Sequence, residues 1–209
     1  MRNLFLASGM GLLLIGAVSA QETPPFAFNV GAGFTQAPGS SGRRLDPGWN
    51  FDAGAGYNFH PYVGLMLQFN YNQLDINTGT LNALGFPGGD IRQWSVTLDP
   101  VVHTNPKGPV DVYFIGGGGL YQRRQEFTAP TTAIFRGFDP FFGFYRTAVP
   151  ANQVLTSYTV NKPGVNGGMG ISFGTKWHVK FYAEARFHRM FLSSSEHSDI
   201  LPVTFGFRW

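Results

Sequence analysis

Eight segments of this chain alternate apolar with polar residues, and this alternation is the feature that most constrains its fold. Successive side chains of a β-strand point to opposite faces, so a period of two indicates a strand with one apolar face. After residue 20, no apolar run approaches the ~20 residues that a membrane-spanning helix needs. Any large apolar surface must therefore be built from strands. The eight segments are 26–35, 49–58, 63–72, 93–103, 110–121, 165–177, 179–191 and 201–209.

The last segment, 201–209, shows the pattern most simply. Its odd positions are all apolar or aromatic, whereas small or polar residues such as Thr204 and Gly206 lie between them. The fifth segment is less regular, because the run Gly116–Gly119 carries no side chains and leaves the register open by one residue. We interpret these glycines as sites where strands or a plugging side chain approach closely.

The connections between the segments alternate in length. Short turns are predicted at 59–62, 104–109 and 175–179. Long loops are predicted at 36–47, 73–91 and 126–164, with a shorter one at 192–199. An even strand count with short turns on one side and long loops on the other is typical of outer-membrane barrels, whose short turns are periplasmic. The sequence therefore predicts an all-β, eight-stranded antiparallel up-and-down transmembrane β-barrel with both termini periplasmic.

The composition of the polar faces indicates which side of the sheet faces lipid. Charged residues make up only 13% of the chain, which is low for a surface that faces water. The polar faces consist mainly of Gly, Asn and Ser, which fits the crowded lumen of an eight-stranded barrel better than a solvated surface. The alternative is a soluble, lipocalin-like barrel. With the apolar face outward, the aromatic residues at strand ends form interfacial girdles: Trp49, Tyr57, Tyr71, Trp94, Trp177 and Trp209.

The N-terminus has the features of a secretory signal peptide. Arg2 precedes an apolar run over 4–18, and Val18-Ser19-Ala20 forms a small-residue cleavage site. Roughly 15 apolar residues are too few for a spanning anchor helix. We therefore predict a signal peptide over 1–20 and one outer-membrane β-barrel domain over 21–209. The chain has no cysteine, and its net charge of +3 is too small to indicate nucleic-acid binding.

Two motifs near the C-terminus resemble the OmpA/OmpX-like outer-membrane β-barrel family. They are the aromatic ending 205–209 and the strand Tyr182-Ala183-Glu184-Ala185-Arg186-Phe187-His188. The resemblance covers the chain from residue 21 onward and implies assembly by the barrel insertion machinery. We predict a monomer surrounded by outer-membrane lipid. It also implies that Phe205, Phe207 and Trp209 form the assembly signal.

Charged residues of both signs are predicted to point into the lumen. Six of them are expected to form a polar network: Asp52, Asp99, Glu184, Arg186, His188 and Arg208. Such a network either lines a polar pore or neutralises itself and plugs the barrel. The plug is favoured, because an eight-stranded interior is just wide enough to be filled by its own side chains.

No catalytic or metal-binding pattern emerges from the sequence. His188 and the run 193–198 contain histidine, serine and acid, but a triad needs a base that contacts a nucleophile in space. The scattered histidines lack the spacing of a metal site, and Gly116–Gly119 lacks the lysine of a phosphate loop. We therefore predict a protein that is not an enzyme and needs no cofactor.

The predicted loops carry most of the remaining chemistry. Arg123, Arg124 and Arg189 could contact lipid headgroup phosphates, although ordinary solvated charge explains them equally well. The 126–164 loop is rich in phenylalanine, which suggests either adhesion to a partner or packing back onto the barrel rim. The hypothesis is a structural or surface-interaction protein that binds an unknown extracellular ligand through its loops. The alternative is a narrow porin-like channel for ions or very small solutes.

Overall fold

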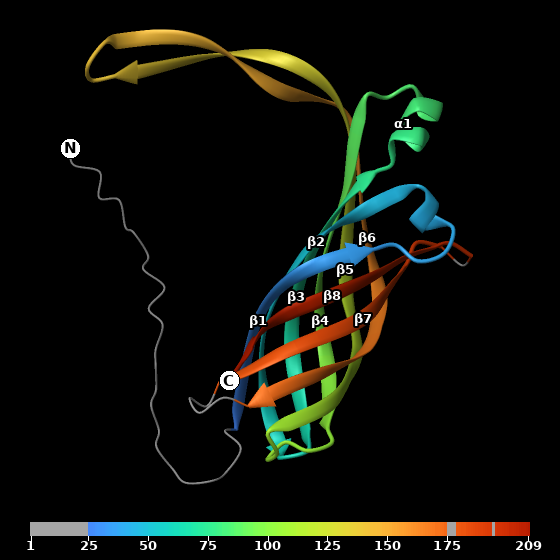
Figure 1. The fold of residues 1–209 in the computed structure, drawn as a ribbon. Coiled ribbons are helices and arrows are strands. Elements are labelled where there is room, and N and C mark those ends of the chain that lie inside the picture. Colours follow the sequence, from blue (N-terminus) through green and yellow to red (C-terminus); the bar gives the residue numbers. More distant parts are fainter. Residues whose placement is uncertain (1–24, 175–178, 194) are drawn as a thin grey trace, which may run out of the picture.

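Each strand of the structure pairs antiparallel with its neighbours in the chain, and the last strand closes the sheet on the first (Figure 1). The computed structural model describes residues 25–174, 179–193 and 195–209. The strands are β1 (Phe26–Gln36), β2 (Leu45–His60), β3 (Val63–Ile76), β4 (Gly88–His103), β5 (Val110–Asp139), β6 (Gly143–Gly174), β7 (Lys180–Phe191) and β8 (His197–Arg208). The expected eight-stranded up-and-down barrel is confirmed.

Closure depends on the pairing of β1 with β8. This ladder runs from Asn29 opposite Arg208 to Gln36 opposite Leu201. Beyond it, Trp209 exchanges two backbone hydrogen bonds with Phe28, at 2.8 and 3.0 Å. A sheet in hydrocarbon has no water to satisfy an open edge, where each unpaired group costs several kcal/mol, so the β1–β8 ladder removes this cost.

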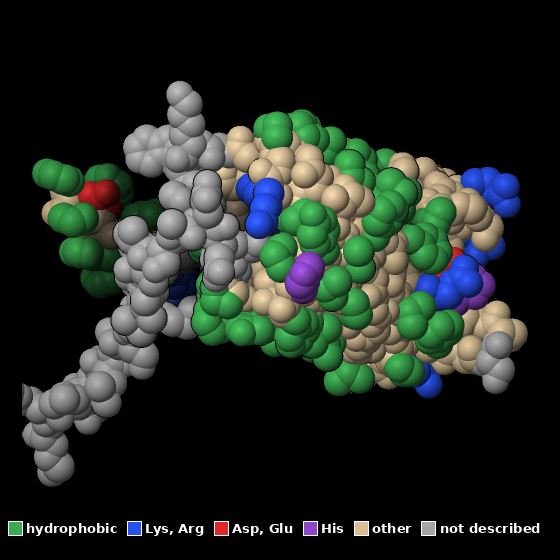
Figure 2. Space-filling view, turned by 90° about the horizontal axis from the view of Figure 1, so that it is seen from below, with side chains coloured by type: hydrophobic (Ala, Val, Ile, Leu, Met, Phe, Trp, Pro, Cys, Tyr) green, Lys and Arg blue, Asp and Glu red, His purple; other side chains and the backbone are tan. Residues whose placement is uncertain are grey.

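The two faces of the strands separate as the alternation predicts. In β8, Thr204 is 7% exposed and faces the lumen, whereas the flanking Phe205 is 44% exposed and faces outward. Figure 2 shows hydrophobic side chains spread over the visible flank of the barrel, with few charged ones among them. The outward positions over 26–34, 49–59, 63–71, 94–102, 110–122, 163–173, 181–187 and 201–209 carry no charged side chain.

Outward aromatic residues gather near both ends of the strands. Toward the long connections, the Trp49 and Tyr71 rings lie 5.1 Å apart. Toward the short turns, Phe28 stacks on Trp209 at 6.1 Å, and the Tyr57 ring packs edge to face with Phe26 and Phe59. These two groups have the arrangement of interfacial girdles. Trp177 and the turn 175–178 lie outside the described residues, as does the predicted signal peptide.

The fifth segment keeps a single register through its glycines. Val112 and Phe114 face outward, and Tyr113 and Ile115 face the lumen. A Cβ on Gly117 would overlap the backbone of β4 and the Asp99 carboxylate, so this glycine lets strand and side chain approach. The predicted close approach is confirmed here.

The expectation of a long loop over 126–164 is wrong. β5 and β6 continue as a two-stranded ribbon that stands away from the barrel rim (Figure 1). It ends in a turn between Asp139 and Gly143, where Gly143 has a φ of 82°. Pro130 and Pro150 are tolerated in these strands because each strand of a two-stranded ribbon has one unpaired edge.

Two other connections contain short helical elements. The β1–β2 connection includes a 3₁₀ turn, Ser41–Arg43. The predicted 73–91 loop is shorter than expected, since β3 runs on to Ile76 and the helix α1 (Thr78–Leu84) follows. The Asn77 side chain caps α1 by accepting a 2.8 Å hydrogen bond from the Gly79 amide. Across the described ranges, no helix is long and apolar enough to cross a membrane.

Single cysteines can test the outward and inward faces of β8, because the chain has no native cysteine. Cysteines at Val203 and Phe205 should react with a membrane-dissolved maleimide, whereas one at Thr204 should not, because its side chain lies in the lumen. Labelling of purified barrels in lipid vesicles, read by mass shift, measures the difference. A Thr204 variant that labels as fast as the other two would contradict the assignment.

Candidate functional site in the barrel lumen

An ion cluster lies in the middle of the lumen. Arg186 is 2% exposed and donates to Glu184 Oε1 at 2.7 Å through Nε and to Asp99 Oδ2 at 2.9 Å through Nη1. Asp99 also accepts from Thr97 at 2.8 Å and from Asn166 at 2.9 Å. The guanidinium thus joins β4 to β7 across the lumen. A buried pair of this kind holds only because each charge has several partners.

A second cluster surrounds Asp52, which is 4% exposed on β2. Tyr182 donates to its Oδ1 at 2.8 Å, and Asn29 donates to Oδ2. The Gln68 side-chain amide then donates to the side-chain oxygen Oδ1 of Asn29 at 3.1 Å. This carboxylate is therefore satisfied by neutral donors from β1 and β7.

Three tyrosines fill the remaining width of the lumen. Tyr113, Tyr121 and Tyr182 are each at most 1% exposed. Tyr113 donates to Glu184 Oε2 at 3.0 Å, which ties the ring to the ion cluster. Glycines face the rings: a Cβ on Gly170 would overlap the Tyr113 ring, and one on Gly31 would overlap the Tyr182 hydroxyl. Ring and glycine together give the close packing expected of a protein interior.

Nearer the long connections, smaller polar groups continue the network. Thr35 donates to Asn72 at 2.7 Å, and Thr204 donates to Asn50 at 2.9 Å. The ring nitrogen Nδ1 of His188 lies 3.1 Å from the Tyr121 hydroxyl. The two threonine bonds join β1 to β3 and β8 to β2, and the histidine contact joins β7 to β5. Hydrogen-bonded side chains therefore extend the packed interior from the ion cluster toward the long connections.

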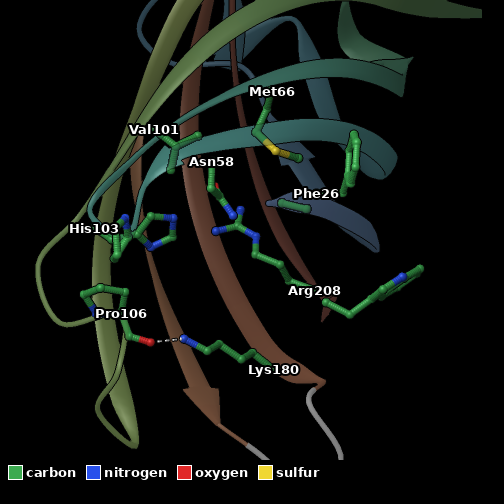
Figure 3. Close-up of a pocket in the computed structure, with 11 residues that line it drawn as sticks. Phe26, Asn58, Met66, Val101, His103, Pro106, Lys180 and Arg208 are labelled. Carbon is green, nitrogen blue, oxygen red and sulfur yellow. Dashed lines mark hydrogen bonds between the residues drawn. The ribbon is translucent and has the colours of Figure 1, made fainter. Parts of the chain in front are cut away.

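Arg208 lies at the turn end of the lumen, beside a small cavity (Figure 3). Its guanidinium stacks 4.1 Å from the centre of the Tyr113 ring and is 3.9 Å from Glu184 Oε2. Lys180 lines the same cavity, and its Nζ donates to the Pro106 backbone carbonyl at 2.7 Å. The cavity holds about 90 Å³, which is well below the ~300 Å³ of a typical ligand pocket. We therefore regard it as a small gap at the lower end of the packed lumen rather than as a ligand site.

The structure brings together four of the six residues predicted for the lumen network: Asp99, Glu184, Arg186 and Arg208. All six are buried, but Asp52 and His188 have other hydrogen-bond partners, Tyr182 and Tyr121. These tyrosines were not among the residues predicted for the network. Their inward positions in the alternation were the available signal, because a buried tyrosine hydroxyl needs a partner.

The arginines predicted at headgroups have acidic partners or face inward. Arg124 lies 2.6 Å from Glu126, and Arg189 makes two hydrogen bonds to Asp199, at 2.9 and 2.8 Å. Arg123 faces the lumen side of β5. Headgroup contact for these three residues stays a prediction. Of the predicted assembly signal, Phe205, Phe207 and Trp209 all point outward, and its role in assembly also stays a prediction.

The histidine and serine residues considered as a catalytic set do not assemble. His188 contacts Tyr121, while the Ser193 hydroxyl accepts from the Glu196 amide at 3.2 Å. Ser194 lies outside the described residues. Within the described ranges, no three His, Cys, Asp or Glu side chains are grouped as metal ligands.

Comparisons with known proteins agree with this architecture. The family described as "Outer membrane protein beta-barrel domain" matches residues 9–206. The crystal structure of Neisserial surface protein A has a TM-score of 0.56 at 14% identity, covering 88% of this chain and 96% of that one. A major outer membrane protein from Thermus thermophilus has a TM-score of 0.55 at 13% identity, covering 88% of this chain and 97% of that one. A search of curated proteins finds no match.

The ion cluster predicts a large stability loss when one of its charges is removed. Glu184→Ala leaves Arg186 and the Tyr113 hydroxyl without their shared acceptor. Breaking a buried pair costs about 3–5 kcal/mol, so the urea midpoint in lipid vesicles should fall sharply. Glu196→Ala, on an exposed loop, is the control and should change stability by less than about 0.5 kcal/mol. Equal midpoints for the two variants would contradict the cluster's role.

The packed lumen also predicts that the barrel does not conduct ions steadily. In planar bilayers the purified chain should show no lasting single-channel openings. Replacing both Tyr113 and Tyr182 with alanine removes two buried rings and should produce small openings. Steady openings from the unchanged chain would favour the channel alternative instead.

Proposed function

The chain belongs to the outer membrane protein β-barrel domain family, and on that premise we propose that it is a non-enzymatic surface-interaction protein of the bacterial outer membrane. The partner-binding element is the ribbon formed by β5 and β6 beyond the rim. In this proposal the short turns and both termini are periplasmic, and residues 1–20 are the export signal. The long connections then face the outside of the cell.

The observation that carries this proposal is the exposed aromatic tip of the ribbon. Phe141 is 95% exposed, Phe144 89% and Phe142 71%. Two ring pairs pack at the tip, Phe138 with Phe144 at 5.0 Å and Phe142 with Tyr145 at 5.8 Å. An apolar patch of this kind, held in water, is typical of an interaction site.

The ribbon also lacks the support that normally stabilises two strands. β4 pairs with β5 only as far as Thr128, and β7 pairs with β6 only as far as Gly164. Beyond these residues both outer edges are unpaired, and an isolated two-stranded hairpin is marginally stable in water. A partner that covers the ribbon would supply the missing contacts, by edge pairing or by burying the rings.

The charges on the ribbon indicate what the partner offers. Arg136 lies directly opposite Arg146 in the ladder, and both are exposed. Like charges across a strand pair are destabilising unless an anion lies between them. The partner should therefore present anionic groups beside an apolar surface.

Shortening the ribbon tests the proposal. Ala129 and Gln153 are paired neighbours, so an Asn-Gly turn in place of residues 130–152 can close the hairpin at the rim. Bacteria that produce this variant should assemble the barrel normally but adhere less to epithelial-cell monolayers and to supported bilayers that contain phosphatidylglycerol. Heat-modifiable migration of the membrane fraction checks the assembly.

A pair of point variants locates the binding element within the ribbon. Phe141→Ser with Phe144→Ser removes the two most exposed rings of the aromatic tip and should reduce adherence as the shortening does. Val154→Ser with Leu155→Ser removes apolar side chains of 48% and 49% exposure at the base, and should leave adherence unchanged. Undiminished adherence of the shortened chain on both surfaces would refute the proposal.

A further inference from the structure

A second cavity lies at the other end of the lumen, at the mouth beneath the long connections. It holds about 370 Å³, within the ~300–1,000 Å³ range of small-molecule sites. Its walls come from five strands, β2, β3, β4, β5 and β8, with α1 and the Ser41–Arg43 turn at the rim. The described chain thus surrounds this space on most sides.

One wall of this mouth cavity is apolar. Leu74 and Ile200 are 1% and 3% exposed, and they pack with Ala37 and Leu45 into one cluster. Lower in the lumen the inward positions of β3 are polar, as at Asn70 and Asn72. The inward face of β3 therefore becomes apolar at the end that opens toward water. The wall of a water-filled pore would be polar at this end.

The adjoining part of the wall, on β4 and β5, carries polar groups without partners. Gln93 is 2% exposed, yet neither its amide nitrogen nor its amide oxygen makes a hydrogen bond to any described residue. Arg123, its cross-strand neighbour, has a buried Nε that likewise lacks a hydrogen-bond partner there. A buried polar group without a bond costs about 1–3 kcal/mol, so a native site of this kind indicates a missing partner.

The cavity is also positively charged at its rim. Arg44, Arg123 and Asp199 all line it, but the Asp199 carboxylate is already bound to Arg189 by two hydrogen bonds, which leaves the two arginines as the lining charges that can bind an anion. The Glu196 carboxylate also faces Arg123 and competes with such an anion. A guanidinium is the side chain best suited to a carboxylate or phosphate, since it donates in a planar fork. The wall therefore offers donors for an anionic headgroup beside an apolar surface for an alkyl chain.

We propose that the mouth cavity binds a single-chain anionic amphiphile. Its headgroup lies between Arg123 and Arg44 and contacts the Gln93 amide, and its alkyl chain packs against Leu74 and Ile200. This site is separate from the aromatic ribbon, so the proposal stands independently of the ribbon's function. Either a free carboxylate from outside the cell or a phosphate headgroup has the required chemistry.

Short, water-soluble probes test the site without the background of lipid partitioning. Full-length barrel in nanodiscs is titrated with octanoate, octyl phosphate or octanol, and the side-chain amide signal of Gln93 is followed by NMR. The signal is assigned by its loss in Gln93→Leu. At least one of the two anions should cause a saturable shift, whereas octanol should cause a much weaker one. Binding of octanoate indicates that the natural ligand is a free carboxylate. Binding of octyl phosphate alone indicates that it is a phosphate headgroup.

Two neighbouring arginines provide a matched pair of variants. Arg123→Gln should weaken anion binding about tenfold, as expected for the loss of one charged hydrogen bond. Arg124→Gln makes the same charge change on the opposite face of β5, where Arg124 is exposed and paired with Glu126, and should leave binding unchanged. The absence of a saturable shift with both anions, equal weakening by the two variants, or equal binding of octanol would each overturn the proposal.

Discussion

The rest of the structure depends on the need to satisfy every backbone hydrogen bond within the sheet. In hydrocarbon an unpaired amide or carbonyl has no alternative partner, so a sheet there must close. The ladder between β1 and β8 meets this need up to the last residue, where Trp209 pairs with Phe28. Closure with only eight strands then fixes a narrow lumen. The interior chemistry follows from that width.

A narrow lumen must be filled by side chains that fit one another. Tyr113 and Tyr182 occupy the width only because glycines face them from β6 and β1. Arg186 bridges strands on opposite sides because the distance between them is short enough for one side chain. The same polar residues would be costly in a wider, dry core, where fewer partners would lie within reach. The same residues therefore fill the lumen and provide partners for its buried charges.

The strands and their two faces could be predicted from the sequence because they depend on local alternation. The inward position of Glu184 and the outward position of Phe205 follow from a period of two within their own strands. The contact between Tyr113 and Glu184 could not be predicted, since it depends on how β5 and β7 are staggered around the barrel. The ribbon was missed because Pro130 and Pro150 are turn residues in most contexts, and only the absence of a third strand makes them acceptable. The unpartnered amide of Gln93 could be found only once its surroundings were known.

The continuity of β5 and β6 has a mechanical consequence. The 11 residues 129–139 of β5 lie beyond Thr128, so at ~3.3 Å per residue the ribbon is roughly 36 Å long. In the described chain no loop separates the tip from the wall, because Phe138 and Tyr113 lie on one strand, which is interrupted only by a register shift at Phe127/Thr128. A pull on the tip therefore loads the ladders along the strand direction, where many hydrogen bonds share the force at once. The ribbon can act as a tether whose anchor is the whole barrel wall.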